Sequence, residues 1–580
     1  MTNLEKLRKH MKKSGVCATV IPTADPHLSE YVPECFKLRR YISGFTGSAG
    51  TLVVTENCAG LWTDGRYYIQ AENELSGSEI RLYRASEKNT IKIYDFLKEN
   101  LPDNAVVGVD GRLFSKKYLD EFISKLGKIT VNADYDPSEI WENRPELPSE
   151  KAFLLDECYC GESALSKIDR VRKIMQKECF THYLVTSPEA VMWLLNIRGN
   201  DVKHTPVMLS YLLLSKEKAA LYVNEAKLSE EVSGYLNRHN IEVADYGEIY
   251  EDISRLPQDS YLNADFSLTY YTLINRASCP KKDFKDIITE LKCIKNKTEI
   301  DNIKKAYEKE NIALTKAFYE IYHTEGIDEC DVCEIIEKYR SKSEGYFSPS
   351  FSTIAAYGKN AAMMHYSPEK GKCSQIEKKG MLLIDTGGQY FEGTTDTTRT
   401  LVMGSLTAEE QENLTLVLKS HIAMAEAVFP KKTKCCEIDA LARMPLWKKG
   451  LDYRCGTGHG VGFMLSVHEG PQRLGASCMQ KLQAGMTVTN EPGVYTKDMY
   501  GIRTENHMCV KETFATEYAE FLCFEILNYC PIGTWYLNSD MLTDDEKKWV
   551  NEYNSKCREN IVPHLTDEEA QWLVSYTKII

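Results

Sequence analysis

Two aspartates on either side of a glycine-rich turn are the most chemically suggestive residues of this chain. Asp385 ends an apolar run, and Asp396 lies on the threonine-rich segment that returns from the turn. This pattern predicts a β-hairpin. If its centre lies between Tyr390 and Phe391, the two carboxylates are directly opposite on one face. Opposed carboxylates repel each other, so a cation must hold them together. A metal ion is one candidate, and the Arg399 guanidinium is the other.

A second acidic pair lies further along the chain. Glu491 occurs in VTNEPGVY and Glu505 in YGIRTEN, and the residues between them read as strand, turn and strand. A turn centred on Asp498 makes the two glutamates face each other. His459, in GTGHGVGF, lies between the two hairpins in sequence. Taken singly, such residues are more often solvated carboxylates and structural histidines than ligands.

The burial expected for these carboxylates favours a metal site. The aspartate and both glutamates adjoin apolar runs, and four part-buried carboxylates are costly unless they are neutralised. Two divalent cations would neutralise them, and a neutral histidine would be a fifth ligand. An oxygen-rich set with one imidazole and no thiolate suits Mn²⁺ or a similar hard ion better than structural zinc. A hydrolytic centre with two ions roughly 3.5–4 Å apart, bridged by hydroxide, fits this set of ligands.

The composition restricts the class of protein. With 580 residues the chain is too long for one core, and 43% hydrophobic with 27% charged residues is ordinary for a soluble globular protein. The net charge of −13, without a long Lys/Arg run, argues against nucleic acid and anionic membranes as partners. We expect no signal peptide and no transmembrane segment. The cysteines show no regular spacing, which favours a reducing cytoplasm.

One cysteine pair has the spacing of a metal-binding motif. Cys330 and Cys333 form the only CxxC of the chain, in the helix-like stretch DECDVCEIIEKY. No second CxxC is present to complete a zinc site, so a structural role is favoured for this pair.

Three domains are predicted. Residues 1–148 and 149–292 share a pattern of opening helix, strand and strand–turn–strand, which indicates a duplicated α/β domain. A third domain, 293–580, carries both acidic pairs and ends in a helical tail of about residues 531–580. Within the first two domains we predict strands Thr51–Thr55, Leu61–Thr63 and Tyr183–Val185 and a helix Ala164–Lys177.

Capping patterns predict the helices of the third domain. Thr298 with Asp301 indicates the start of a long amphipathic helix, and Thr407 with Glu410 that of a helix ending at Pro430. Two further pairs cap the helices of the tail, Thr543 with Glu546 and Thr566 with Glu569.

The motifs taken together resemble a known family. IDTGGQYFEGTTDTTRT, GTGHGVG, VHEGP, EPGVY and GIRTEN resemble the metallopeptidases of the pita-bread fold, and most closely the aminopeptidase P family. SGFTGSAGTLVVTE and WLLNIRGNDVKHTPV resemble the first and second domains of that family. The resemblance therefore implies a mixed α/β (α+β) fold in which two creatinase-like N-terminal domains precede a pita-bread catalytic domain.

The resemblance also implies roles for particular residues. Five would bind two metal ions, most favourably Mn²⁺. In that assignment Asp396 and Glu505 bridge both ions. Asp385 completes the shell of the first ion, and His459 and Glu491 complete the shell of the second. His365, in MMHYSP, and His468 would orient substrate and stabilise developing charge, and Glu491 would also transfer the proton.

The implied activity is removal of the N-terminal residue from short peptides with proline at position two, by a hydroxide that bridges the metal ions. The family resemblance further implies a homodimer in the cytoplasm. A prolidase acting on Xaa-Pro dipeptides is the nearest alternative. A non-catalytic peptide-binding protein is less favoured, since all five ligands are present.

One position departs from the family pattern. The segment before the metal-binding histidine commonly reads R-H-G-T-G-H in the family, whereas this chain has Cys455 in place of the first histidine. The ligands are unchanged, but substrate affinity and pH profile could differ. A buried, inert thiol is favoured over a redox-sensitive one.

Overall fold

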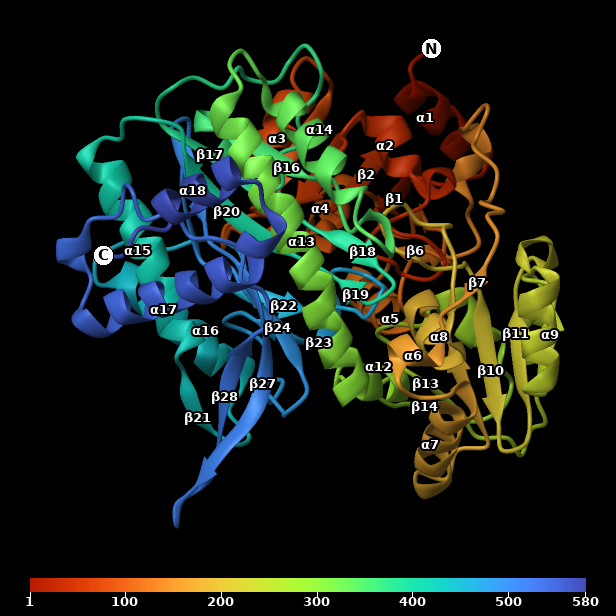
Figure 1. The fold of residues 1–580 in the computed structure, drawn as a ribbon. Helices are drawn as coiled ribbons and strands as arrows, with labels where there is room; N and C mark the ends of the chain where they lie inside the picture. Colours follow the sequence, from red (N-terminus) through yellow and green to blue (C-terminus); the bar gives the residue numbers. More distant parts are fainter. The chain divides into compact units, whose positions relative to one another are not determined.

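The computed structural model describes residues 1–580, which form two compact units. Unit 1 comprises residues 1–155 and 162–288, and unit 2 comprises residues 156–161 and 289–580. Figure 1 labels the elements of both units. None of the helices combines the length and the apolar character that are needed to span a bilayer.

Unit 1 contains two six-stranded sheets with equivalent strand orders, β4-β3-β2-β1-β5-β6 and β12-β11-β10-β8-β13-β14. In each sheet an antiparallel hairpin lies beside the first strand, and the outer strands pair in parallel. The predicted duplication is therefore confirmed. The strands are β1 (Ala18–Pro22), β2 (Thr51–Thr55), β3 (Ala59–Thr63), β4 (Ile80–Arg84), β5 (Val106–Gly108), β6 (Thr130–Asn132), β8 (His182–Val185), β10 (Tyr211–Ser215), β11 (Ala219–Tyr222), β12 (Ile241–Ala244), β13 (Leu262–Ala264) and β14 (Lys281–Asp283).

Both faces of the first sheet are covered by apolar side chains. Val20 and Val53 belong to one core cluster, whereas Ile21 and Leu52 belong to another. Successive residues of a strand point to opposite faces, so a sheet buried on both faces has nearly continuous apolar strands.

The helices of unit 1 are α1 (Asn3–Lys13), α2 (Leu38–Ser43), α3 (Tyr68–Glu74), α4 (Ile93–Asn100), α5 (Lys116–Leu126), α7 (Ala164–Lys177), α8 (Pro188–Leu195), α9 (Glu230–Arg238), α10 (Ile249–Ser254) and α11 (Tyr271–Arg276). A short pair, β7 (Phe153–Leu154) with β9 (Ile197–Arg198), completes the unit, and α12 (Ile287–Lys292) leads into unit 2.

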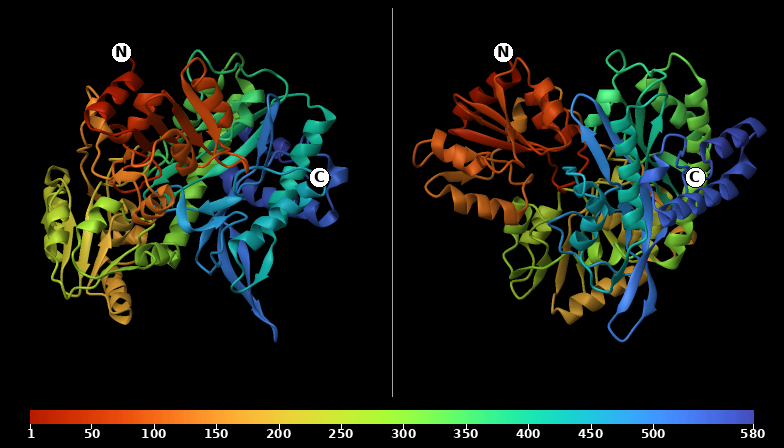
Figure 2. Two further views of the ribbon diagram at one scale, coloured as in Figure 1. Left: turned by 180° about the vertical axis from the view of Figure 1, so that it is seen from behind. Right: turned by 90° about the vertical axis from the view of Figure 1, so that its left-hand side faces the viewer.

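Unit 2 surrounds several small sheets with helices. Its helices are α6 (Glu157–Cys160), α13 (Lys297–His323), α14 (Glu329–Arg340), α15 (Ala408–Ala425), α16 (Cys435–Trp447), α17 (Asp544–Ile561) and α18 (Asp567–Tyr576). Its strands are β15 (Tyr346–Pro349), β16 (Ile354–Tyr357), β17 (Met381–Thr386), β18 (Gly388–Tyr390), β19 (Gly393–Thr394), β20 (Thr397–Val402), β21 (Val428–Pro430), β22 (Gly458–Gly460), β23 (Glu469–Leu474), β24 (Thr487–Asn490), β25 (Gly493–Thr496), β26 (Tyr500–Arg503), β27 (Asn506–Ala515) and β28 (Glu520–Ile526). Strands β27 and β28 continue as a two-stranded arm that projects from the unit in every view (Figures 1 and 2).

Strand β17 is the element that orients the first predicted aspartate. Leu382 and Ile384 pack in the core cluster that α13, α14 and α17 share. Met381 and Leu383 belong to other clusters. Alternate residues of a strand share a face, so Asp385 points to the same face as these two. The carboxylate therefore leaves the sheet on the face opposite the helical core.

Two helix boundaries differ from the prediction. Helix α13 begins two residues earlier, because Asn296 and Glu299 form the capping box instead of Thr298 and Asp301. Helix α15 ends at Ala425, well before Pro430, because the next residues pair with β28 as strand β21. The boxes of Thr407, Thr543 and Thr566 are confirmed.

Candidate metal centre

The first hairpin has a different register from the one predicted. Its centre lies between Phe391 and Glu392, because Tyr390 pairs with Gly393. Asp385 consequently lies opposite Thr398 instead of Asp396. Moving the centre by one residue moves every partner by two, and a shift of two keeps the same face. The two aspartates are therefore diagonal neighbours on one face, still close enough for charge repulsion.

Arg399 is not the cation that balances this pair. It is paired with Ile384, so its side chain leaves the opposite face of the sheet from Asp385. There it donates to Tyr553, Asn506 and the backbone oxygens around Cys530. The alternative prediction, that the Arg399 guanidinium balances the two aspartates, is thus wrong.

Arg503 holds Asp385 instead. Its guanidinium donates to Asp385 Oδ2 at 2.5 Å, to Thr398 Oγ1 at 3.1 Å and to the Tyr495 hydroxyl at 2.6 Å. The other carboxylate oxygen of Asp385 is buried and accepts no hydrogen bond. A buried carboxylate oxygen without a donor is unusual, and a cation would satisfy it.

The second hairpin has the predicted register. Gly493 pairs with Arg503, and Asn490 pairs with Asn506, so the turn is centred on Asp498. Glu491 and Glu505 lie between these two ladders at equivalent positions. The Glu505 carboxylate accepts from Thr398 at 2.7 Å, and its backbone N–H donates to Thr398 O. The two hairpins are thus joined through Thr398.

His459 brings the pairs together. Its Nε2 lies 3.4 Å from Asp396 Oδ2 and 3.6 Å from Glu491 Oε1. The ligand atoms of Asp396, His459 and Glu505 all lie within 4.8 Å of one another. His459 Nδ1 is 2.9 Å from the Gly460 carbonyl oxygen, which favours Nε2 as the free ligand nitrogen.

The crowding of these groups changes their protonation. Burial raises the pKa of Asp385 to about 6; Arg503 opposes the rise, and the neighbouring Asp396 and Glu491 add to it. The pKa of Glu505 is raised well above its usual value by burial and then by the Asp396 and Glu491 charges. Burial lowers the pKa of His459, but the adjacent Asp396 and Glu491 carboxylates outweigh this effect and raise the pKa to about 9. The carboxylates thus need protons or cations close by.

The donor set fits divalent cations. It offers four carboxylates and one imidazole, one carboxylate oxygen has no other partner, and no thiol lies among the ligands. Hard divalent cations prefer such oxygen-rich ligation.

The two other predicted histidines lie in different settings. The His468 ring stands edge-on to His459, with 4.2 Å between the ring centroids and an interplanar angle of 89°. His365 lies half-buried in the loop that follows the short 3-10 helix Gly358–Ala362. The ring contact brings His468 to the cluster, whereas the role of His365 stays a prediction.

Cys455 is close to the charged groups of the site. Burial raises the pKa of its thiol to about 12, and the nearby Glu491 carboxylate adds to the rise. At neutral pH the thiol is therefore protonated, as expected for an inert cysteine.

Buried ion pairs and hydrogen bonds hold the segments that carry the predicted ligands. Glu469, next to His468, accepts from Lys292 at 2.6 Å and also from Lys295. Tyr307 of α13 exchanges hydrogen bonds with the backbone N–H and carbonyl of Asp396. None of these partners was predicted, because a lysine or tyrosine in a helical pattern carries no signal of its distant contacts. Arg503 lies inside the GIRTEN motif, but its contact with Asp385 was not predicted either.

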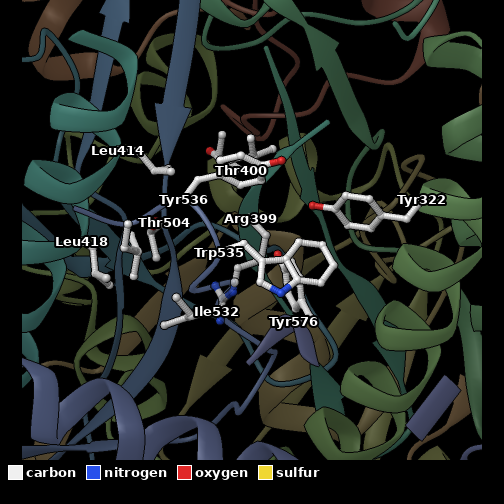
Figure 3. Close-up of a pocket in the computed structure, with 13 residues that line it drawn as sticks. Tyr322, Arg399, Thr400, Leu414, Leu418, Thr504, Ile532, Trp535, Tyr536 and Tyr576 are labelled. Carbon is white, nitrogen blue, oxygen red and sulfur yellow. The ribbon is translucent and has the colours of Figure 1, made fainter. Parts of the chain in front are cut away.

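The cavity in Figure 3 is separate from this cluster. It has a volume of about 30 Å³, enough for about one water molecule, and none of the predicted ligands lines it. Trp535, Tyr536 and Tyr576 of the C-terminal tail surround it together with Tyr322, whose hydroxyl points inward (Figure 3). It belongs to the packing of the tail on β20.

Sequence comparisons place the chain among known proteins. A protein of Coprinopsis cinerea described as probable Xaa-Pro aminopeptidase P is 36% identical over 605 residues, which cover 98% of this chain and 97% of that protein. The pattern of metallopeptidase family M24 matches residues 301–512, and that of its C-terminal region matches residues 520–580. The chain belongs to metallopeptidase family M24. The creatinase/prolidase N-terminal domain pattern of its relatives matches twice, at residues 3–139 and 143–299.

Structural comparisons agree with this M24 assignment. The X-prolyl aminopeptidase from Caenorhabditis elegans, described as a cytosolic enzyme with a di-nuclear active site, superimposes with a TM-score of 0.95 at 30% identity and covers 100% of both chains. The prolidase from Pyrococcus furiosus has a TM-score of 0.50 at 27% identity, covering 61% of this chain and 98% of its own. The predicted fold, two creatinase-like domains before a pita-bread domain, is thereby confirmed.

Proposed function

We propose that this M24 protein is a metal-dependent aminopeptidase that releases the N-terminal residue from peptides with proline at position two. The convergence of Asp396, His459 and Glu505 within 4.8 Å carries the proposal, because it places a hydrolytic donor set in one site. The full-length similarity to proteins described as Xaa-Pro aminopeptidases supports the choice of substrate.

Five residues would hold two divalent cations: Asp385, Asp396, His459, Glu491 and Glu505. Mn²⁺ is the ion that the oxygen-rich donors favour. When bound, a pair of such ions supplies an ionised water near neutral pH and polarises the scissile carbonyl.

The protein's own groups would complete the reaction. The Glu491 carboxylate accepts the proton of the attacking water and passes it to the departing proline nitrogen. A ring N–H of His468 donates to the oxygen that becomes negative in the transition state. Arg503 keeps Asp385 ionised and oriented through the 2.5 Å contact. His365 orients the substrate.

The wider assignment rests on the family. We place the protein in the cytoplasm, as the C. elegans enzyme is described, acting as a homodimer on short proline-containing peptides. Neither nucleic acid nor a membrane is included as a partner, in keeping with the net charge of −13. The division into domains 1–148, 149–292 and 293–580 is part of the same proposal.

Substrate length separates this function from that of a prolidase. Metal-free protein reconstituted with Mn²⁺ should cleave Xaa-Pro-Xaa tripeptides and spare Xaa-Ala-Xaa peptides of the same length. Cleavage confined to the Xaa-Pro dipeptide would make the protein a prolidase. No cleavage of any peptide would favour a non-catalytic peptide-binding protein.

Variants test the metal centre itself. Asp396→Asn should abolish peptide cleavage and lower the amount of bound Mn²⁺, measured by elemental analysis after gel filtration. The control is Asp301→Asn on α13, where the aspartate pairs with Lys297 at the surface and both readouts should match those of the unaltered protein. Unchanged metal content in Asp396→Asn would contradict the ligand assignment.

A further inference from the structure

A second cluster of potential metal ligands lies outside the proposed centre. The ligand atoms of Asp328, Cys330 and Cys373 all lie within 4.8 Å of one another, and all three residues are half-buried. Asp328 and Cys330 belong to the start of α14, whereas Cys373 comes from the loop between the 3-10 helix Gly358–Ala362 and β17. Two distant segments thus contribute to one set of donors. The partner of Cys330 is Cys373, and not the Cys333 of the CxxC motif.

The helix start fixes two of the donors. Asp328 is the N-cap of α14, and its Oδ1 accepts from the N–H groups of Cys330 at 2.8 Å and Asp331 at 2.9 Å. Its carboxylate is therefore oriented without using Oδ2 for the cap. Cys330 lies in the first turn, where the helix dipole would help to stabilise a metal-bound thiolate.

The loop backbone fixes the third donor. The N–H of Ser374 donates to the Glu329 carboxylate at 2.8 Å, and the N–H of Glu329 donates to Ser374 O at 3.1 Å. The next residue, Gln375, forms an antiparallel bridge with Asp328. Cys373 directly precedes these two residues, so their bonds hold it beside the start of α14. A preorganised set of donors costs little conformational entropy on binding.

The donors differ in kind from those of the dimetal centre. With two sulfurs beside one carboxylate oxygen, this set is softer and selects Zn²⁺ over the hard ions that suit an oxygen-rich site. Burial, the neighbouring Cys373 thiol and the Asp328 and Glu329 charges raise the pKa of Cys330 to about 12. Without a cation the Cys330 thiol stays protonated, and a thiophilic cation would displace its proton.

We propose that Asp328, Cys330 and Cys373 bind one Zn²⁺ ion, with a water molecule as its fourth ligand. On binding, each thiol loses its proton to solvent and each sulfur donates a lone pair to the ion, with no change in oxidation state. The ion joins the loop that carries His365 to the first turn of α14. The effect on the enzyme rests on the function proposed above; the binding itself does not.

Cobalt spectroscopy provides the test. The full-length protein, stripped of metal and kept reduced with a phosphine, is titrated with Co²⁺ in the absence of oxygen. A thiolate-to-cobalt charge-transfer band in the near ultraviolet should appear and should vanish on addition of Zn²⁺. The dimetal ligands include no thiolate and give no such band.

Variants assign the band to its ligands. Cys330→Ser and Cys373→Ser should each lose the band and bind one equivalent of Zn²⁺ less than the unaltered protein. Asp328→Asn should weaken Zn²⁺ binding while α14 stays capped, because asparagine is an equally good N-cap. Cys333→Ser is the matched control: its sulfur contacts Thr353 O at 3.7 Å and is not one of the three clustered donors, so the band should persist.

Two results would overturn the proposal. One is the absence of the band in the reduced protein, whether or not Cys330 and Cys373 form a disulfide when that protein is exposed to air. The other is a band and a Zn²⁺ stoichiometry that survive in both Cys330→Ser and Cys373→Ser. Asp396→Asn separates this proposal from the proposed function, because it should lose peptidase activity and keep the band.

Discussion

Arg503 is the residue on which the organisation of the first carboxylate depends. It is buried and donates to Asp385, Thr398 and Tyr495, so it neutralises a charge and also orients the two hairpins. In metal-free protein, Arg503→Leu should lower the free energy of unfolding by about 3–5 kcal/mol, since a buried charge loses its partner. Denaturant unfolding of the variant and of the unaltered protein measures this difference.

Two further variants make the Arg503 result specific. Arg503→Lys keeps the charge but cannot form the same fork of hydrogen bonds, so its loss of stability should be smaller. Arg473→Leu, at an exposed arginine of the same unit, should change the unfolding free energy by less than about 0.5 kcal/mol. Equal stabilities of Arg503→Leu and the unaltered protein would show that the Asp385 carboxylate does not depend on this partner.

Cys455 is the residue that the family resemblance predicts to be a histidine in relatives. If the missing imidazole contacts substrate in relatives, Cys455→His should raise kcat/KM for a tripeptide with proline at position two. The thiol stays protonated at neutral pH, because burial raises its pKa to about 12. Cys435→Ser, at a buried cysteine of α16, is the control for removal of a thiol. A kcat/KM that does not change in Cys455→His would make the position neutral for catalysis.

At the scale of elements, α14 is linked to the loop that carries His365 through one buried carboxylate. Glu329 is fully buried and accepts from the Tyr357 N–H at 2.6 Å, the Tyr366 hydroxyl at 2.8 Å and the Ser374 N–H at 2.8 Å. Glu329→Gln replaces one acceptor oxygen with a donor. It should lower the unfolding free energy by about 1.5–3 kcal/mol, the range for hydrogen bonds to a charged group.

The location of the Glu329 effect can be measured separately. Amide hydrogen exchange of residues 357–376 should accelerate in Glu329→Gln, whereas exchange in β24 and β27 should not change. Glu334→Gln, an exposed glutamate on the same helix, should leave both regions unaltered. Faster exchange throughout unit 2 would instead indicate global destabilisation.

The two hairpins show what sequence could predict at this scale. In the second hairpin the strands on either side of Asp498 are of equal length, and the φ of 62° at Asp498 suits a turn. Centring the turn on this residue was therefore enough to predict the register. The first has glycines on both sides of its turn, and the chain turns one residue further on, before Gly393 with φ 140°. The alternation of strands would have excluded Arg399 in either register. No local pattern reveals that Cys373 reaches Cys330, because that contact depends on the path of a long loop.

At the scale of the whole molecule, the two sheets of unit 1 are joined by a neutral histidine. His27, after β1, contacts the Thr186 carbonyl oxygen through Nδ1 at 2.7 Å and the Tyr246 hydroxyl through Nε2 at 2.7 Å, and it stacks on Tyr211. Its backbone N–H donates to the buried Asp25 carboxylate. Burial lowers the pKa of His27 to about 4, opposed by the Thr186 oxygen and the Glu189 charge, while the Lys227 charge lowers it further.

This junction should make unit 1 sensitive to acid. An unfolded histidine takes up a proton near pH 6.5, whereas folded His27 does so only near pH 4. The unfolded state therefore binds more protons between these values, and stability falls as pH decreases from about 6.5 to about 4. The total loss is about 3 kcal/mol, since each pKa unit corresponds to about 1.4 kcal/mol. Denaturant unfolding at pH 7.5 and pH 5 measures this loss of stability, and hydrogen exchange in β1 and β8 at the same pH values locates it.

The comparison of variants isolates the histidine from other acid-sensitive groups. His27→Gln cannot take up a proton in this range, so the fall in stability between pH 7.5 and pH 5 should be smaller in the variant by about 2 kcal/mol. Asp25 contributes with the opposite sign, because burial raises its pKa, but it is present in both proteins and cancels. His239→Gln, at the C-cap of α9, should retain the full pH dependence. If His27→Gln retains it as well, the acid sensitivity of unit 1 comes from elsewhere, and the two sheets do not depend on a neutral imidazole for their contact.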